Sequence, residues 1–182
     1  MVSTNELSKE LLETIFKDIA KSLKQLRGKD KVELIIVGGA SILLNYDFRA
    51  STTDIDCYDT YGLLMNDIMS NIGDKYNLPN DWINTDFLNT TSFTPKIVQY
   101  SQYYKTYGDV LTIRTIKDEY LIAMKLKAGR DYKHDLSDIL GILQSNSNIN
   151  LEMINNAYIN LYGCLDSVNK EAYAMLVGII NK

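Results

Sequence analysis

Two aspartates two positions apart, Asp54 and Asp56, are residues whose type and spacing indicate chemistry. They lie in a segment that alternates like a β-strand, in which every second side chain points to the same face. Ile55 and Cys57 would then face the core, while both carboxylates share the opposite face. Side-by-side carboxylates repel each other unless a cation neutralises them, and Mg²⁺ prefers such oxygen ligands. The pair therefore predicts a metal site, although the solvated face of an edge strand shows the same pattern.

A glycine pair, Gly38-Gly39, stands upstream of the aspartates, directly after an apolar run at residues 32–37. The run is rich in β-branched residues and predicts a buried strand, and residues 40–46 predict a short helix. A helix that begins here points free backbone N–H groups and its positive dipole end at any anion beyond the strand. Ser41 adds a hydroxyl donor in the first turn. The pattern is typical of a phosphate site, and equally of a tight strand-to-helix turn.

The two motifs in sequence resemble the nucleotidyltransferase superfamily, which shares the polymerase-beta catalytic fold. The resemblance covers residues 32–58. Arg49 and the residues after it read R-x-S-T-x-D-I-D, which is similar to the bacterial branch of AbiEii-type toxins. The resemblance implies transfer of a nucleoside monophosphate from an NTP to an acceptor hydroxyl, with two Mg²⁺ ions. The residues that it implies are Gly38, Gly39, Ser41, Arg49 and Lys125 for the nucleotide, Asp54 and Asp56 for the metal, and Asp54, Asp56 and Lys125 for catalysis.

A second similarity to that branch lies in residues 119–139, EYLIAMKLKAGRDYKHDLSDI. Helical spacing places Lys125 on or beside an apolar stripe, where a lysine must either extend to solvent or meet an anion. We favour contact with a nucleotide phosphate. Asp135 and Asp138 on the next helix either pair with Arg130, Lys133 or Lys125, or support the active site. His134, among charged residues, is expected to be exposed.

A third carboxylate, which polymerase-like transferases commonly use, is harder to place. The strands expected later in the chain carry no acid. Asp86 and the turn residue Asp109 are the nearest candidates in sequence, and Asp59 is at an odd spacing from the pair. The proton-abstracting step therefore has three readings: Asp86 substitutes, the substrate supplies its own base, or part of the activity is lost.

Composition narrows the class of protein. The chain has 182 residues, a net charge of −4 and two cysteines. An acidic protein is an unlikely binder of duplex nucleic acid. Cys57 and Cys164 match no metal-ligand spacing, so free thiols in a reducing, cytoplasmic setting are expected. No apolar run approaches the length of a membrane span. The N-terminus has acids where a secretory signal would carry a basic region and an apolar block.

The elements that would position these residues alternate between helices and strands. Helices are expected at residues 7–26, 63–76, 118–128 and 132–143, with two more from about 151 and 167. Strands are expected at residues 52–58, 97–103 and 110–116, with a turn at 107–109 between the last two. This order predicts an α+β fold with a mixed β-sheet flanked by helices. We expect a nucleotidyltransferase-like domain at residues 1–145 and a helical extension, residues 146–182, packed on it.

Two function classes remain open. The first is a nucleotidyltransferase whose acceptor is a protein, an RNA end or a small molecule. The second is a catalytically weak nucleotide-binding or regulatory module, such as one component of a toxin–antitoxin-like pair. The missing strand carboxylate favours the second class, whereas the complete glycine and aspartate motifs favour the first.

Overall fold

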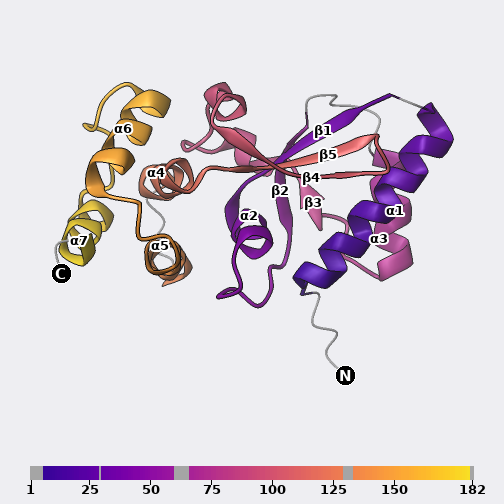
Figure 1. Cartoon of the computed structure of the whole chain (residues 1–182), viewed down its shortest axis with the longest axis horizontal. Helices are drawn as coiled ribbons and strands as arrows, with labels where there is room; N and C mark the ends of the chain where they lie inside the picture. Colours follow the sequence, from indigo (N-terminus) through magenta and orange to yellow (C-terminus); the bar gives the residue numbers. More distant parts are fainter. Residues whose placement is uncertain (1–5, 29, 60–65, 129–132, 181–182) are drawn as a thin grey trace. The chain divides into compact units, whose positions relative to one another are not determined.

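The computed structural model describes residues 6–28, 30–59, 66–128 and 133–180 (Figure 1). The fold is α+β. Its helices within these ranges are α1 (Lys9–Arg27), α2 (Gly38–Asn45), α3 (Asn66–Tyr76), α4 (Asp118–Ala128), α5 (Lys133–Ser145), α6 (Leu151–Tyr162) and α7 (Lys170–Ile180), with 3-10 turns η1 (Asp86–Asn89) and η2 (Pro95–Val98). Its strands are β1 (Val32–Ile36), β2 (Ile55–Asp59), β3 (Ile83–Asn84), β4 (Ser101–Tyr107) and β5 (Leu111–Ile116).

The chain divides into two compact units. The sheet unit comprises Met1–Thr85 and Gln102–Thr115, and the helical unit comprises Asp86–Ser101 and Ile116–Lys182. Helices α4 and α5 thus belong to the same unit as α6 and α7. The expected domain at residues 1–145 with an extension at 146–182 stays a prediction.

The sheet is mixed, with strand order β3-β2-β1-β5-β4. Strand β1 pairs antiparallel with β2 and parallel with β5, so it has a partner on each side. Such a central strand needs apolar residues on its buried faces, and β1 reads VELII. Strand β2 also pairs in parallel with the short β3, and Asp56 lies opposite Asn84. The predicted mixed sheet is therefore confirmed.

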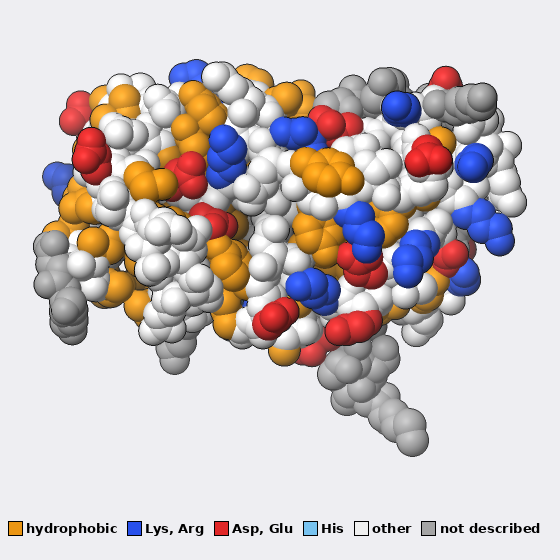
Figure 2. Space-filling view, viewed as in Figure 1, with side chains coloured by type: hydrophobic (Ala, Val, Ile, Leu, Met, Phe, Trp, Pro, Cys, Tyr) orange, Lys and Arg blue, Asp and Glu red, His pale blue; other side chains and the backbone are white. Residues whose placement is uncertain are grey.

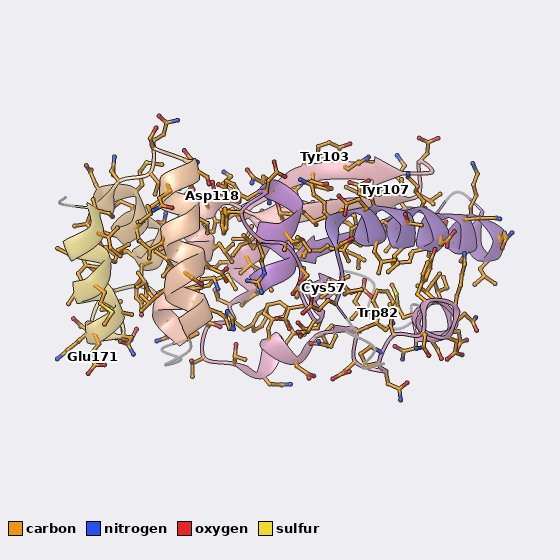
Figure 3. All side chains as sticks on the ribbon, turned by 90° about the horizontal axis from the view of Figure 1, so that it is seen from below. Cys57, Trp82, Tyr103, Tyr107, Asp118 and Glu171 are labelled. Atoms are coloured by element: carbon orange, nitrogen blue, oxygen red, sulfur yellow. The ribbon has the colours of Figure 1, made fainter. Side chains whose placement is uncertain are left out.

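Helices α1 and α3 lie side by side along one face of this sheet (Figure 1). Helix α1 begins at the cap Ser8, whose side chain accepts a hydrogen bond from the Leu11 amide, and ends at Gly28 with φ +68°. Apolar residues of both helices pack on alternate residues of the strands to form one core. Cys57 of β2 and Trp82, in the segment after α3, lie in this core (Figure 3).

Two predicted strands have wrong boundaries. The strand with the aspartates begins at Ile55 and not at residue 52, because Thr52 forms an isolated antiparallel bridge with Leu7. The strand expected at residues 97–103 is Ser101–Tyr107. The cause is Thr94, whose side chain accepts from the Lys96 amide and, with Pro95, starts the 3-10 turn η2. The turn predicted at residues 107–109 is confirmed.

That turn has a clear sequence cause. Gly108 and Asp109 have φ values of +56° and +61°, the left-handed conformation that both central residues of a type I′ hairpin turn need. The amide of Val110 donates to the Tyr107 carbonyl at 3.2 Å. Glycine and aspartate tolerate this conformation better than most residues do.

The helical unit is arranged around α4, which contacts α5 and α6. Six of the residues of α4 are buried, which is why its sequence is apolar on several sides: Tyr120, Leu121, Ile122, Ala123, Met124 and Leu126. The ring of Tyr120 stacks on Tyr100 with centroids 4.0 Å apart. The Tyr162 hydroxyl donates to the Ser92 carbonyl at 2.6 Å, and Tyr158 is fully buried. Aromatic residues of α6 thus pack inside this unit.

A partly buried carboxylate, Glu13 of α1, joins that helix to β4. It accepts hydrogen bonds from the Tyr104 hydroxyl and the Lys105 ammonium, each at 2.7 Å. Burial alone would raise the pKa of Glu13, but the bonds from Lys105 and Tyr104 outweigh it and lower the pKa from its ordinary 4.5. A lowered folded-state pKa adds stability above the unfolded value, and that stability is lost as pH falls through the folded pKa.

We therefore expect Glu13→Gln to lower the free energy of unfolding by about 1–2 kcal/mol at pH 7, because the charge-assisted bonds are lost. The difference from the native protein should shrink as the pH falls below about 4.5, where the native carboxyl also becomes neutral. Urea titrations at pH 7 and pH 3.5 measure both values. A difference that stays the same at the two pH values would contradict this account.

Among the described helices, none combines the length and the apolar character that a crossing of the bilayer requires.

Candidate active site

The start of α2 leaves backbone N–H groups without a side-chain cap. Strand β1 ends at Ile36, Val37 is the helix cap, and no side chain hydrogen-bonds to the first turn from that cap. Gly38 has φ +62°, a conformation that glycine adopts without strain. The first backbone N–H groups of a helix have no partner inside the helix, and the dipole adds positive potential there. This geometry suits a phosphate group.

Side chains of the protein itself already lie beside the two glycines. A methyl group at Gly38 would lie 3.1 Å from Oδ2 of Asp56. A methyl group at Gly39 would lie 2.7 Å from Nη2 of Arg49 and 3.1 Å from Oγ1 of Thr52. The sequence suggested one reason for glycine here, which is access for a phosphate. The structure adds another, which is close approach of an arginine and an aspartate to the backbone.

The side chains of Asp54 and Asp56 lie away from the core, as their spacing predicted. Asp54 directly precedes β2 and Asp56 is its second residue; both are partly exposed, whereas Ile55 and Cys57 are buried in the core. Oδ1 of Asp54 accepts a hydrogen bond from the Thr53 hydroxyl at 3.2 Å. The carbonyl of Asp56 accepts from the amide of Val37, the cap of α2, at 3.0 Å. The strand with the aspartates is thereby tied to the glycine turn.

Cys57, next to Asp56 in β2, has its side chain buried in the core. Burial, together with the charges of Asp59 and Asp56, raises the pKa of its thiol to about 12. A raised pKa favours the protonated thiol at neutral pH, which is a weaker metal ligand and nucleophile than the thiolate. Both cysteines are free, as the sequence predicted.

The hydroxyl of Ser41, which the sequence suggested as a donor to a phosphate, lies inside the protein. Ser41 is fully buried, and among the described residues its hydroxyl oxygen has no hydrogen-bond partner. A buried hydroxyl without a partner costs about 1–3 kcal/mol. An unpaired donor in the first turns of α2 is compatible with a ligand at this helix end. Its contact with a phosphate stays a prediction.

Among the described residues, no three His, Cys, Asp or Glu side chains group together in a way that could hold an ion. Asp86 begins η1 in the helical unit, and Asp109 lies in the hairpin turn. The role of Asp86 as the missing carboxylate stays a prediction.

Lys125 of α4 forms a charged cluster with α5, in the helical unit. Its Nζ lies 2.6 Å from Oδ1 of Asp135 and 2.9 Å from Oδ2 of Asp138. The side chains of Lys125 and Asp138 are only 9% and 7% exposed, so the pair is largely desolvated. Of the partners that the sequence left open, Lys125 is therefore the one observed. Arg130 and the side chain of Lys133 lie outside the described residues.

Two further residues of this region can be placed. His134 is exposed, as predicted. Lys127 does not join the cluster; its Nζ lies 5.4 Å from the ring centroid of Tyr162. The predicted contact of Lys125 with a nucleotide phosphate stays a prediction, and the lysine has two carboxylate partners in the protein.

Leu7 and Thr52 are site-supporting residues that sequence reasoning missed. Their backbones exchange two hydrogen bonds, Leu7 N to Thr52 O at 2.7 Å and Thr52 N to Leu7 O at 3.0 Å. The available signal in the sequence was weak: one leucine, Leu7, immediately before a serine that could cap a helix. The bridge fastens the segment that leads into Asp54.

Replacing Gly39 by alanine should disrupt this site, because the new methyl group would collide with the Arg49 guanidinium. Because the guanidinium is the far end of a flexible side chain and can shift, we expect a small loss, at most about 1 kcal/mol of stability, the low end of overpacking costs. Gly178 of α7 is the matched control, since a methyl group there meets no atom within 4 Å. Gly178→Ala should gain up to about 1 kcal/mol from helix propensity. Equal thermal stability of the two variants would refute the close packing of Arg49 on Gly39.

Comparison with known proteins supplies the last observations on this site. The family model described as "Nucleotidyltransferase of unknown function (DUF6036)" matches residues 12–181. No curated protein matches the sequence. Among solved structures, the chain is similar to an antigenic nucleotidyltransferase-like protein from Paracoccidioides brasiliensis, with 14% identity and a TM-score of 0.47. That match covers 97% of this chain and 94% of the other.

Proposed function

We propose, from the premise that the chain belongs to the family of nucleotidyltransferases of unknown function DUF6036, that it transfers a nucleoside monophosphate from an NTP to an acceptor hydroxyl. One observation carries the proposal. The Asp56 carboxylate lies against Gly38 at the start of α2, 3.1 Å from where a methyl group of residue 38 would be. A helix end suited to an anion and a carboxylate suited to a cation thus adjoin, which supports binding of a metal-bound triphosphate.

The donor set fits a hard divalent cation such as Mg²⁺. Asp54 and Asp56 offer carboxylate oxygens on one face, and Mg²⁺ characteristically takes one or two carboxylates plus water and substrate phosphates. Bound there, the ion would neutralise charge on the phosphates during transfer. A second ion, which the family resemblance implies, would need ligands beyond this pair. It stays a prediction.

The residues of the chain would act mainly by positioning and electrostatics. The first-turn amides of α2, from Gly38 and Gly39, would hold the β- and γ-phosphates, with Ser41 as an added donor. The acceptor oxygen bonds to the α-phosphorus, the bond to the β-phosphate oxygen breaks, and pyrophosphate leaves. The acceptor's proton passes to Asp86 or to a base of the substrate. Lys125 or Arg49 would offset charge on the leaving group.

The acceptor class stays open among a protein, an RNA end and a small molecule. Net charge is −4, which disfavours a large RNA. In the view of Figure 2, Lys and Arg side chains are interspersed with Asp and Glu and form no continuous basic surface on that face. The setting in which the protein works is proposed to be the cytoplasm.

A second candidate function is a nucleotide-binding or regulatory module of a toxin–antitoxin-like pair. The observation that favours it is that, within the described ranges, no third acid gathers with Asp54 and Asp56. A module of this kind binds nucleotide without releasing pyrophosphate. Pyrophosphate release in the presence of candidate acceptors therefore separates the two functions.

Calorimetry with ATP, GTP, CTP and UTP tests the shared part of both candidates. Each nucleotide is titrated with Mg²⁺ into native protein, into Asp54→Ala/Asp56→Ala and into the control Asp47→Ala, whose side chain is 99% exposed. We expect Mg²⁺-dependent binding of at least one nucleotide to the native and control proteins, lost in the double variant. Folded native protein that binds none of the four would refute the proposal.

A further inference from the structure

The loop between α2 and β2 is fastened at several points although it contains no regular element. It runs from Tyr46, which caps α2, to Asp54, which precedes β2. One of the two predicted metal ligands therefore lies at the end of a loop. A ligand on a loop keeps its position only if other contacts hold that loop, because connecting segments are otherwise the more mobile parts of a fold.

Arg49 makes the most central of these contacts. Its Nε donates to the Ser51 carbonyl at 3.0 Å, which folds the loop back on itself. Its guanidinium lies against the Cα of Gly39, since Nη2 and Cζ are 2.7 and 2.8 Å from where a methyl group would be. A planar guanidinium can stack on a bare backbone and donate at the same time, and a lysine ammonium cannot.

Thr52 connects Gly39, which Arg49 also contacts, to Asp54. Its Oγ1 donates to the carbonyl of Asp54 at 3.2 Å and also lies beside Gly39. Its backbone exchanges two hydrogen bonds with Leu7, whose side chain is fully buried. The Ser51 hydroxyl donates to Glu6 at 3.0 Å, next to this bridge. Contacts thus run from the glycine turn through Arg49 and Thr52 to the aspartate, with the segment before α1 as the outer anchor.

We propose that Arg49 is a positioning residue, which fixes Asp54 relative to the start of α2 through Ser51, Thr52 and Gly39. The inference deepens the proposed function and rests on it for the role of Asp54. It differs from the family-derived expectation that Arg49 contacts the leaving pyrophosphate. Both roles use the positive charge, but only positioning requires the guanidinium shape and affects the protein before any ligand is bound.

Hydrogen exchange on the metal-free protein tests the positioning role directly. In Arg49→Lys, the amides of residues 52–56 should exchange about tenfold faster, because the hydrogen bond to Ser51 and the contact with Gly39 are lost. Asp47→Ala, in the same loop, removes an exposed ion pair with Lys9 and should leave these amides unchanged. Thr52→Val keeps the backbone bridge to Leu7, removes the bond to Asp54, and should give a smaller increase. Unchanged exchange in Arg49→Lys overturns the inference.

Metal binding without nucleotide provides the second readout. Calorimetric titration with Mg²⁺ should show about tenfold weaker binding to Arg49→Lys than to native protein, the size typical of a residue that orients a ligand. Methylguanidine added to Arg49→Ala should recover part of that affinity. If Mg²⁺ binding is unchanged and only NTP affinity falls, Arg49 contacts the nucleotide and the inference is overturned. If exchange accelerates as expected but native protein binds neither Mg²⁺ nor NTP, the positioning role holds and the proposed function fails.

Discussion

Lys125→Met is expected to destabilise the protein by about 3–5 kcal/mol, the typical cost of removing one partner from a buried ion pair. The ammonium of Lys125 lies between Asp135 and Asp138, and little solvent reaches it or Asp138. Without the lysine, two carboxylates of α5 would remain close together and would lose the ammonium that lies between them. Urea denaturation followed by circular dichroism measures the loss.

Two further variants test the cause of that loss. Lys127→Met removes another lysine of α4, whose ammonium lies over the ring of Tyr162. This substitution should lower the free energy of unfolding by less than about 1 kcal/mol. Lys125→Met/Asp135→Asn/Asp138→Asn removes all three charges and should recover much of the stability, because burial of neutral groups costs less. A triple variant as unstable as Lys125→Met would show that packing, and not charge, accounts for the effect. If the triple variant folds, its NTP affinity also tests the predicted phosphate contact.

If the proposed function holds, Asp54→Asn should reduce the proposed transfer activity by about 10²–10³-fold while the protein stays fully folded. The amide keeps the size of the side chain and its bond with Thr53, but it loses the charge that a divalent cation needs. The melting temperature should stay equal or rise slightly, because the substitution removes the repulsion between the neighbouring carboxylates of residues 54 and 56. Release of pyrophosphate from the NTP that binds best, together with the melting temperature, measures both effects.

Asp47→Asn provides the control for this substitution. It makes the same chemical change in the loop before Asp54, where the side chain is exposed and pairs only weakly with Lys9. Activity should be unchanged. Full activity in Asp54→Asn would remove this aspartate from the mechanism, whereas loss of activity together with unfolding would assign it a structural role.

Local features of the fold were predictable because they depend on neighbouring residues. The period-two alternation from Asp54 to Cys57 predicted which side chains are buried, and helix α4 begins and ends where its pattern predicted. Glycine and aspartate at residues 108–109 predicted the hairpin turn from their tolerance of positive φ. In each case, backbone preference and hydrophobic period act within a few residues.

Other boundaries were not predictable from local pattern. Residues 52–54 alternate like a strand, but Thr52 pairs with Leu7, which is distant in sequence, and β2 begins only at Ile55. Residues 97–100 are rich in β-formers, yet the cap Thr94 and Pro95 start a 3-10 turn that includes residues 97 and 98. A long-range bridge and a cap each outweighed propensity, which is a weak preference.

The sequence alone determined which residue types this protein brings to its candidate site: two glycines at a helix start, two carboxylates two positions apart, and an arginine in the loop between them. Only the tertiary structure decided what those residues touch. It placed the Arg49 guanidinium on Gly39 and two aspartates on Lys125. The physical reason is that spacing fixes the face on which a side chain lies, whereas its partner is set by the segment that folding packs against that face.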